Sequence, residues 1–305
     1  MQIFREVAMI YSQIDKNKTG SFAIIVFFTL LVLLLGYYFG KVTGWGSWGL
    51  VFALLLSVIA VFVSYYYSDS IILSMSRALP VDPQEQPYLA NTVEGLSIAA
   101  GIPMPKLYLI DDPAPNAFAT GRDPKHSAIC CTTGLVKMLN RQELEGVIAH
   151  EMSHIKNYDI LIASVTVVLV GVVAMLSDWL LRHVRWSRLG GRDRGVGGGP
   201  GLVLLLISII LALLAPLTAQ LLRLAVSRKR EFLADASGAL LTRYPEGLAS
   251  ALEKISKDRN ELSVANKATA HLFIVNPFFD IKGKINDLFN THPPTEERIR
   301  ILRSM

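Results

Sequence analysis

A-H-E-M-S-H-I at residues 149–155 contains the pattern H-E-x-x-H, and the rest of the chain is interpreted around this stretch. On a helix, His150 and His154 lie one turn apart on the same face, so both imidazoles can bind one tetrahedral zinc ion. Glu151 lies next to that face, where its carboxylate can act on a water molecule as a general base without binding the metal. The same pattern also occurs by chance on surface helices, so the surrounding sequence has to decide between the two interpretations.

The composition is that of a membrane protein with a water-exposed part. Of the 305 residues, 51% are hydrophobic and 18% are charged, and the mean hydropathy is +0.40. These values are too apolar for an ordinary soluble domain. The net charge of +5 is not gathered into one basic surface with interleaved aromatic residues, which argues against nucleic-acid binding. Cys130 and Cys131 are adjacent, which suits neither a disulfide nor a thiolate zinc site, and we expect them to be small apolar strand residues in a reducing compartment.

Four apolar segments are long enough to cross a bilayer. Residues 19–40 and 42–68 contain no charged residue and are separated by a short glycine-rich turn, so they predict an N-terminal transmembrane hairpin. Residues 160–181 and 202–222 predict a second hydrophobic hairpin, whose connection at 182–200 is rich in arginine and glycine. The chain is therefore expected to be a multi-pass membrane protein.

Four crossings would place both termini on one side of the membrane, together with residues 69–159 and 223–305. Basic residues flanking the apolar segments are more numerous on that side, which predicts that it is the cytoplasmic side of the cell membrane. The arginines at 182–200 oppose this assignment, and the alternative is a second hairpin that packs against the first without crossing. The expected organisation is a transmembrane hairpin (1–68), a catalytic domain in two parts (69–159 and 223–305) and the second hairpin (160–222).

The segments outside the hairpins predict helices around a small sheet. Residues 82–101 predict a helix that begins at Asp82-Pro83 and ends at Gly101. Residues 106–110 and 127–132 predict short strands. Between them, residues 116–121 form either a loop or an edge strand, and an exposed edge can bind an extended peptide by strand addition.

The motif helix has its own start signal and a core-facing side. Asn140 followed by Glu143 is the pattern of a capping box, which predicts the helix N-terminus. The apolar side chains that follow fall on one stripe and are expected to pack on the sheet. They are Leu144, Val147, Ile148, Met152 and Ile155.

Polar residues near the end of the chain are candidates for completing the site. Glu231 and Asp235 lie one helical turn apart, a weak pattern that also fits a solvated face. A catalytic zinc held by two histidines needs a third protein ligand, and Glu231 is the expected one; Asp235 would orient an imidazole or the ligand helix. His292 and Arg298 flank the start of the last helix. Each is either an ordinary terminal or surface residue or a cation near the metal that stabilises an oxyanion.

Together these motifs resemble the HtpX family of membrane-bound zinc metalloproteases, which are kin to the CAAX prenyl proteases. The resemblance covers nearly the whole chain and rests on the N-terminal hairpin, N-A-F-A-T-G at 116–121, H-E-x-x-H at 150–154, R-E-F-L-A-D at 230–235 and H-P-P at 292–294. It implies an α+β fold, with a mainly helical zincin-like domain that carries a small sheet and faces the cytoplasm. It also implies cleavage of misfolded or damaged membrane proteins in protein quality control.

The resemblance assigns roles residue by residue. It implies one zinc ion per chain bound by His150, His154 and Glu231, with Glu151 as the catalytic residue. It implies that a substrate polypeptide aligns on an edge strand made of Asn116, Ala117, Phe118 and Ala119. Two positions depart from the family pattern: Leu233 stands where relatives often have His, and Tyr158 stands where they often have Gly. Neither is an assigned ligand, and Tyr158 is expected to stiffen the passage into the third apolar segment.

The expected reaction is metal-assisted peptide hydrolysis by a zinc endopeptidase. Glu151 takes a proton from the attacking water and passes it to the leaving amine, while the metal, aided by His292 or Arg298, holds the oxyanion. One alternative is an intramembrane protease, which the charged residues flanking the motif argue against. Another is a scaffold or transporter with a structural zinc, which would need a fourth protein ligand such as His292. The sequence leaves the particular substrates and the oligomeric state open.

Overall fold

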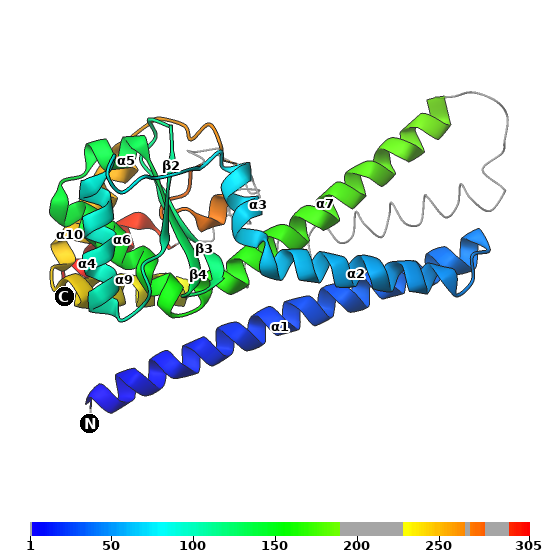
Figure 1. Ribbon diagram of the computed structural model, residues 1–305, viewed down its shortest axis with the longest axis horizontal. Coiled ribbons are helices and arrows are strands. Elements are labelled where there is room, and N and C mark those ends of the chain that lie inside the picture. The colour runs from blue at the N-terminus through cyan, green and yellow to red at the C-terminus, as the bar shows by residue number, and fades with distance from the viewer. Residues whose placement is uncertain (1, 190–227, 266–268, 278–292) are drawn as a thin grey trace.

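The computed structural model describes residues 2–189, 228–265, 269–277 and 293–305. Two long helices, α1 (Gln2–Thr43) and α2 (Trp48–Tyr66), lie side by side and extend away from a domain of shorter helices and a sheet (Figure 1). A third long helix, α7 (Asp159–Leu189), leaves the same domain and diverges from the first two (Figure 1). The predicted segment 202–222 lies outside the described residues.

Helices α1 and α2 form the predicted N-terminal hairpin. Ile14–Tyr37 and Trp48–Tyr66 each have the length and apolarity to cross a membrane. The helices touch closely because small residues line their crossing: a Cβ atom on Gly36 would lie 2.2 Å from the Cβ of Ala53. Many large side chains of α2 are exposed, including Trp48 at 73%, as expected for a surface covered by lipid.

Helix α7 contains the predicted third apolar segment, and its first half packs against the hairpin. Ile162, Val165 and Leu169 share a buried cluster with Ile24 and Phe28 of α1. Helix α6 (Arg141–Lys156) and the Asp159–Met175 part of α7 are together long and apolar enough to cross a membrane. The two are bent by 79° relative to each other. The helix that carries the H-E-x-x-H pattern therefore turns directly into a helix that runs along the hairpin.

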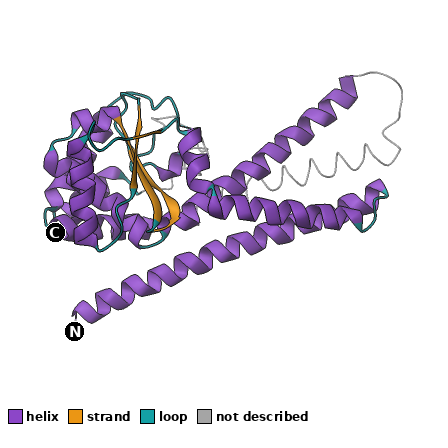
Figure 2. Cartoon of the chain, viewed as in Figure 1, coloured by secondary structure: helices purple, strands orange, loops and turns teal. Residues whose placement is uncertain are grey.

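The sheet is mixed and has the strand order β1-β2-β4-β3. Strand β2 (Lys106–Ile110) pairs with β1 (Leu79–Pro80) antiparallel and with β4 (His126–Thr132) parallel. Strand β3 (Ala117–Asp123) pairs antiparallel with β4 and forms the outer edge (Figure 2). The two predicted strands and the predicted edge strand are thus confirmed within one or two residues.

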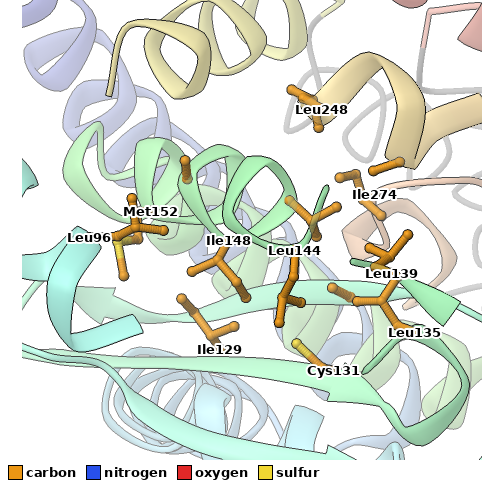
Figure 3. Close-up of a cluster of buried hydrophobic side chains, with 14 of the residues drawn as sticks. Leu96, Ile129, Cys131, Leu135, Leu139, Leu144, Ile148, Met152, Leu248 and Ile274 are labelled. Atoms are coloured by element: carbon orange, nitrogen blue, oxygen red, sulfur yellow. The ribbon is translucent and has the colours of Figure 1, made fainter. Parts of the chain in front are cut away.

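Both faces of the sheet are buried, as the two adjacent cysteines illustrate. Successive strand residues point to opposite faces, so Cys131 joins the core under α6 while Cys130 joins a second cluster with Phe118 and Phe273. Leu144, Ile148 and Met152 of α6 point onto Ile129 and Cys131 in the first core (Figure 3). The predicted apolar stripe of the motif helix is buried along its whole length.

The remaining helices pack on α6, on the sheet or on one another. They are α3 (Ser68–Met75), α4 (Pro87–Ala100), α5 (Thr133–Met138), α9 (Arg228–Thr242), α10 (Pro245–Lys257), the short η1 (Ala270–Leu272) and α12 (Thr295–Leu302). The predicted helix at 82–101 ends at Gly101 as expected, with a φ of 68°, but the predicted start at Asp82 is wrong. The Asp82 carboxylate instead accepts a hydrogen bond from the backbone N–H of Gln84, which stabilises a turn, and Pro87 starts the helix.

Candidate metal centre

Helix α6 is fixed at its N-terminus by the predicted capping box. The Asn140 side chain accepts the backbone N–H of Glu143, and the Glu143 carboxylate accepts the backbone N–H of Asn140. Glu143 also accepts hydrogen bonds from Ser250 and Lys254 of α10. Burial opposes ionisation of Glu143, but these bonds hold its pKa below its ordinary value. The start of the motif helix is thereby tied to α10.

Three candidate ligands meet at the other end of α6. The Nε2 atoms of His150 and His154 lie 3.1 Å apart. The Glu231 carboxylate, from α9, lies 3.8 Å from Nε2 of His150 and 3.5 Å from Nε2 of His154. Helix α9 reaches this position because of its small residues: a Cβ atom on Gly238 would lie 3.0 Å from the backbone nitrogen of His150. Among the residues that the structure describes, these three form the one group of His, Cys, Asp or Glu side chains suited to a metal ion.

The geometry of this group fits zinc. Ligand atoms about 2.0–2.1 Å from a tetrahedral zinc ion are about 3.3 Å from one another. The two Nε2 atoms are 3.1 Å apart, and one Glu231 oxygen lies 3.5 Å from His154 while the other lies 3.8 Å from His150, so the three side chains approach that spacing. Two imidazole nitrogens and one carboxylate oxygen are also the donor types of a catalytic zinc site, in which a fourth position remains for water.

The imidazole of His150 is supported by a buried ion pair. Its Nδ1 atom lies 2.9 Å from Asp235, one turn beyond Glu231 on α9. Arg298 of α12 donates two hydrogen bonds to the same carboxylate, at 2.8 and 2.7 Å. Burial disfavours a charge on Asp235, but the Arg298 guanidinium and the hydrogen bonds from His150 and Arg298 hold its pKa well below the usual range. An ionised carboxylate at Nδ1 directs Nε2 of His150 toward the metal position.

The imidazole of His154 is supported by a residue that the sequence interpretation missed. Its Nδ1 atom lies 3.0 Å from a carboxylate oxygen of Asp159, the first residue of α7. The other oxygen of Asp159 accepts a hydrogen bond of 2.6 Å from the side-chain amide of Asn17 in α1. Burial alone would lower the pKa of His154, but the Asp159 hydrogen bond and the charges of Glu231 and Asp159 raise it to about 9. In the sequence, Asp159 could have been noticed as an acidic residue five positions after His154, whereas nothing connects Asn17 with the motif.

Glu151 directly follows His150 in α6 and is buried. It is 2% exposed, and this burial raises its pKa, although the nearby His150, His154 and Arg298 act in the opposite direction. A carboxylate with a raised pKa is a better proton acceptor than a surface glutamate, because it holds the proton more tightly at neutral pH.

The outer edge of β3 is partly covered by the chain itself. The carbonyl of Asn116 accepts a hydrogen bond from the backbone N–H of Thr132 in β4. Backbone N–H and C=O groups alternate in direction along a strand, so those of Ala117 and Ala119 point away from β4. The Ala117 carbonyl accepts a hydrogen bond from the backbone N–H of Ile274. Farther along, Ser164 of α7 lies 3.4 Å from the backbone nitrogen of Gly121. Ala119 lies between these two covered positions.

The structure brings together most of the predicted site residues. His150, Glu151, His154, Glu231, Asp235 and Arg298 form one buried cluster. His292 lies outside the described residues. Arg298 approaches His150 from its Nδ1 side, at 3.5 Å, and its Nη1 atom donates to the carbonyl of Ile274. Arg298 is 1% exposed and so is no surface residue, and its guanidinium also lies 3.8 Å from the Glu231 carboxylate.

This fold and this site define a membrane-bound metallopeptidase. The chain belongs to peptidase family M48, whose family model matches residues 83–305. Its similarity to proteins named Protease HtpX homolog extends beyond that region: 46% identity with the one from Caldanaerobacter subterraneus subsp. tengcongensis (97% of this chain, 98% of the relative) and 49% with the one from Dictyoglomus thermophilum (97% and 94%). The resemblance drawn from the motifs is thereby confirmed.

A solved structure shows the same fold. The crystal structure of S. mikatae Ste24p aligns with a TM-score of 0.51 at 19% identity, covering 99% of this chain and 67% of that one. At this identity the match concerns the arrangement of helices and strands and not the chemistry. Membership of the peptidase family implies polypeptide substrates, and the apolar helices of the hairpin imply a lipid bilayer.

Proposed function

We propose that the chain is a zinc-dependent endopeptidase in which His150, His154 and Glu231 bind the metal and Glu151 is the general base. The convergence of three ligand atoms on one point, two of them oriented by buried carboxylates, is the observation that supports this most directly. When bound, zinc lowers the pKa of a water ligand to about 7 and polarises a carbonyl. Three ligands among the described residues suit a catalytic zinc, which keeps a position for water, whereas the structural zinc of a scaffold needs a fourth protein ligand.

The chain's own residues carry the proton transfers. Glu151 accepts a proton from the attacking water and delivers it to the amine that leaves when the peptide bond breaks. Burial of Glu151 keeps bulk water from competing for that proton. Asp235 and Asp159 hold the two imidazoles with Nε2 facing the metal position.

Fewer residues of β3 are available to pair with a substrate than the sequence indicated. Of Asn116, Ala117, Phe118 and Ala119, only Ala117 and Ala119 face outward, and Ala117 already accepts a bond from Ile274. We expect an extended substrate to pair with Ala119, as an added strand antiparallel or parallel to β3. Ala119→Pro, which removes the outward N–H donor, should reduce cleavage of peptides, with Ala119→Gly, which keeps that donor, as the control.

The role of Glu151 is tested by Glu151→Gln in the full-length protein in detergent. The variant should keep one zinc per chain and lose casein cleavage and self-cleavage by at least about 100-fold. Glu145→Gln is the matched control, because Glu145 lies on the same helix and pairs only with Arg141 at the surface. A zinc-loaded Glu151→Gln variant with normal activity would refute the assignment.

We further propose that the catalytic domain, residues 69–159 and 223–305, faces the cytoplasm at the cell membrane, where it cleaves misfolded or damaged membrane proteins. The site supports this because α6 turns directly into α7, which packs along the hairpin close to where a membrane substrate would emerge. Reporter fusions at the C-terminus and within residues 190–200 should report opposite sides if the second hairpin crosses, and the same side if it does not. In proteoliposomes, a destabilised single-span reporter should be cleaved faster than its stable parent; equal rates would refute selectivity for damaged proteins.

A further inference from the structure

Asn17 connects the membrane hairpin to the metal centre. Its side-chain nitrogen donates to the Asp159 carboxylate at 2.6 Å and to the backbone carbonyl of Asn157 at 2.8 Å. Asn157 is the C-cap of α6, and Asp159 is the first residue of α7. One amide from α1 therefore holds both sides of the turn that follows His154.

The burial of Asn17 makes these bonds consequential. The residue is 0% exposed and lies three residues into a candidate membrane span. A buried amide without partners costs free energy, so Asn17 is compatible with this position only while its N–H groups are paired. The pairing depends on α1 being docked against the junction of α6 and α7. A second contact at the same place is the ammonium of Lys18, 4.4 Å from the centre of the Tyr158 ring.

The two oxygens of Asp159 have different tasks. One bonds to Nδ1 of His154, and the other accepts from Asn17. A carboxylate held at one oxygen only can rotate and release the imidazole, whereas a carboxylate held at both is fixed. Groups that orient a metal-binding imidazole in this way typically change metal affinity 10–100-fold when removed. Arg230, with its Nε atom 3.8 Å from Asp159, is too far for a hydrogen bond to take over this role.

We infer that Asn17 is a positioning residue of the metal centre, which acts through Asp159 on the ligand His154. The docking of the first transmembrane helix and the affinity for the metal are then two aspects of one interaction. This inference rests on the proposed zinc site. It explains why Asn17 is buried while its neighbours Lys16 and Lys18 are exposed.

The test is zinc affinity, measured by chelator competition on the full-length protein in detergent. Asn17→Ala should weaken zinc binding about tenfold, and Asp159→Ala by about 10–100-fold. Because the effect passes through Asp159, adding Asn17→Ala to Asp159→Ala should cause no further loss. Asn17→Leu, which keeps the volume but lacks the donors, should be as weak as Asn17→Ala.

Ser21 provides the matched control. It lies one turn farther along α1, is buried, and its hydroxyl donates only to the carbonyl of Asn17 within the same helix. Ser21→Ala should retain the zinc affinity of the unmodified protein. Thermal melting of each metal-free variant checks that a loss of affinity does not reflect unfolding, and Asn17→Leu decides if the alanine variant does not fold.

Three results would overturn the inference: normal affinity in Asn17→Leu, additive losses in the double variant, or an equal loss in Ser21→Ala. Failure of the proposed function is distinguishable from these. In that case the unmodified protein would bind no stoichiometric zinc, or binding would persist after His150→Ala. If the unmodified protein binds one zinc and the Asn17 variants bind it with the same affinity, only the role of Asn17 is refuted.

Discussion

The two histidines of the proposed metal site have the same kind of support but receive it from opposite ends of the chain. His150 bonds to Asp235, whose charge is balanced by the buried guanidinium of Arg298 in the last helix. His154 bonds to Asp159, which is held by the neutral amide of Asn17 in the first helix. One support belongs to the core of the catalytic domain, and the other is shared with the membrane hairpin.

The two supports therefore differ in how much each contributes to the stability of the fold and how much to metal binding. The pair of Asp235 and Arg298 is almost fully buried, at 1% exposure each, so neither charge can lose its partner without a large penalty. Around Asp159 the hydrogen-bonding partners are His154 and a neutral amide, and the Arg230 guanidinium lies 3.8 Å away, so loss of the amide leaves a cation beside the carboxylate. We therefore expect changes on the His150 side to unfold the domain and changes on the His154 side mainly to weaken metal binding.

The largest effect is expected from Arg298→Ala. Removing the guanidinium leaves the Asp235 carboxylate buried beside Glu231 without a cation and removes the donor to the Ile274 carbonyl. Breaking a buried pair from one side costs about 3–5 kcal/mol of stability. Arg303→Ala is the control, because Arg303 forms only exposed ion pairs with Glu246 and Glu253. Metal-free melting curves of the two variants measure the difference, and equal melting temperatures would contradict this view of the core.

The next effect separates the two carboxylates. Asp235→Asn and Asp159→Asn should both weaken zinc binding by about 10–100-fold. Only Asp235→Asn should also lower the melting temperature of the metal-free protein markedly, because it removes the carboxylate that accepts two hydrogen bonds from the buried Arg298 and leaves Glu231, at 3.8 Å, as the nearest anion. Chelator competition and metal-free melting, performed on both variants, give the comparison. Equal destabilisation by both variants would mean that the two supports do not differ in kind.

The same comparison shows what the sequence could and could not predict. The motif helix followed from local signals, namely the capping box at Asn140 and the position of His150 and His154 one turn apart. Glu231 followed from the need for a third ligand. The role of Asn17 could not be predicted, because it depends on the 79° bend between α6 and α7, which places Asp159 against α1.

Other local features show the same limit. Asp82-Pro83 and Pro87 are both acceptable helix starts by local rules, and the turn at Asp82 decided between them. The segment around Ile274 has no periodic pattern, yet it covers the Ala117 carbonyl and receives Arg298. Such positions depend on contacts between residues far apart in the sequence, and chain-local patterns carry no signal for them.

A smaller effect is expected at the far end of α6, away from both supports. The pKa of Glu143 is lowered in the folded state, so its contribution to stability is complete above its unfolded pKa of about 4.3 and is lost as the pH falls through its lower folded value. At pH 7, Glu143→Gln should cost about 1 kcal/mol, since the partner Lys254 is half exposed. Melting curves between pH 7 and pH 3.5 should show this difference shrinking at the acid end. A constant difference would contradict the role of the charge.

The smallest effect is expected at Tyr158, between His154 and its support Asp159. Tyr158 has a φ of 60°, a left-handed conformation that costs a residue with a side chain about 1 kcal/mol and costs glycine almost nothing. Both Tyr158→Ala and Tyr158→Gly remove the ring that faces Lys18, so the difference between them isolates the backbone cost. The glycine variant should therefore be the more stable of the two by about 1 kcal/mol in thermal melting. If alanine is equal or better, the bend after α6 is not strained, and the junction that carries Asp159 is held by Asn17 and the packing of α7 without a backbone cost.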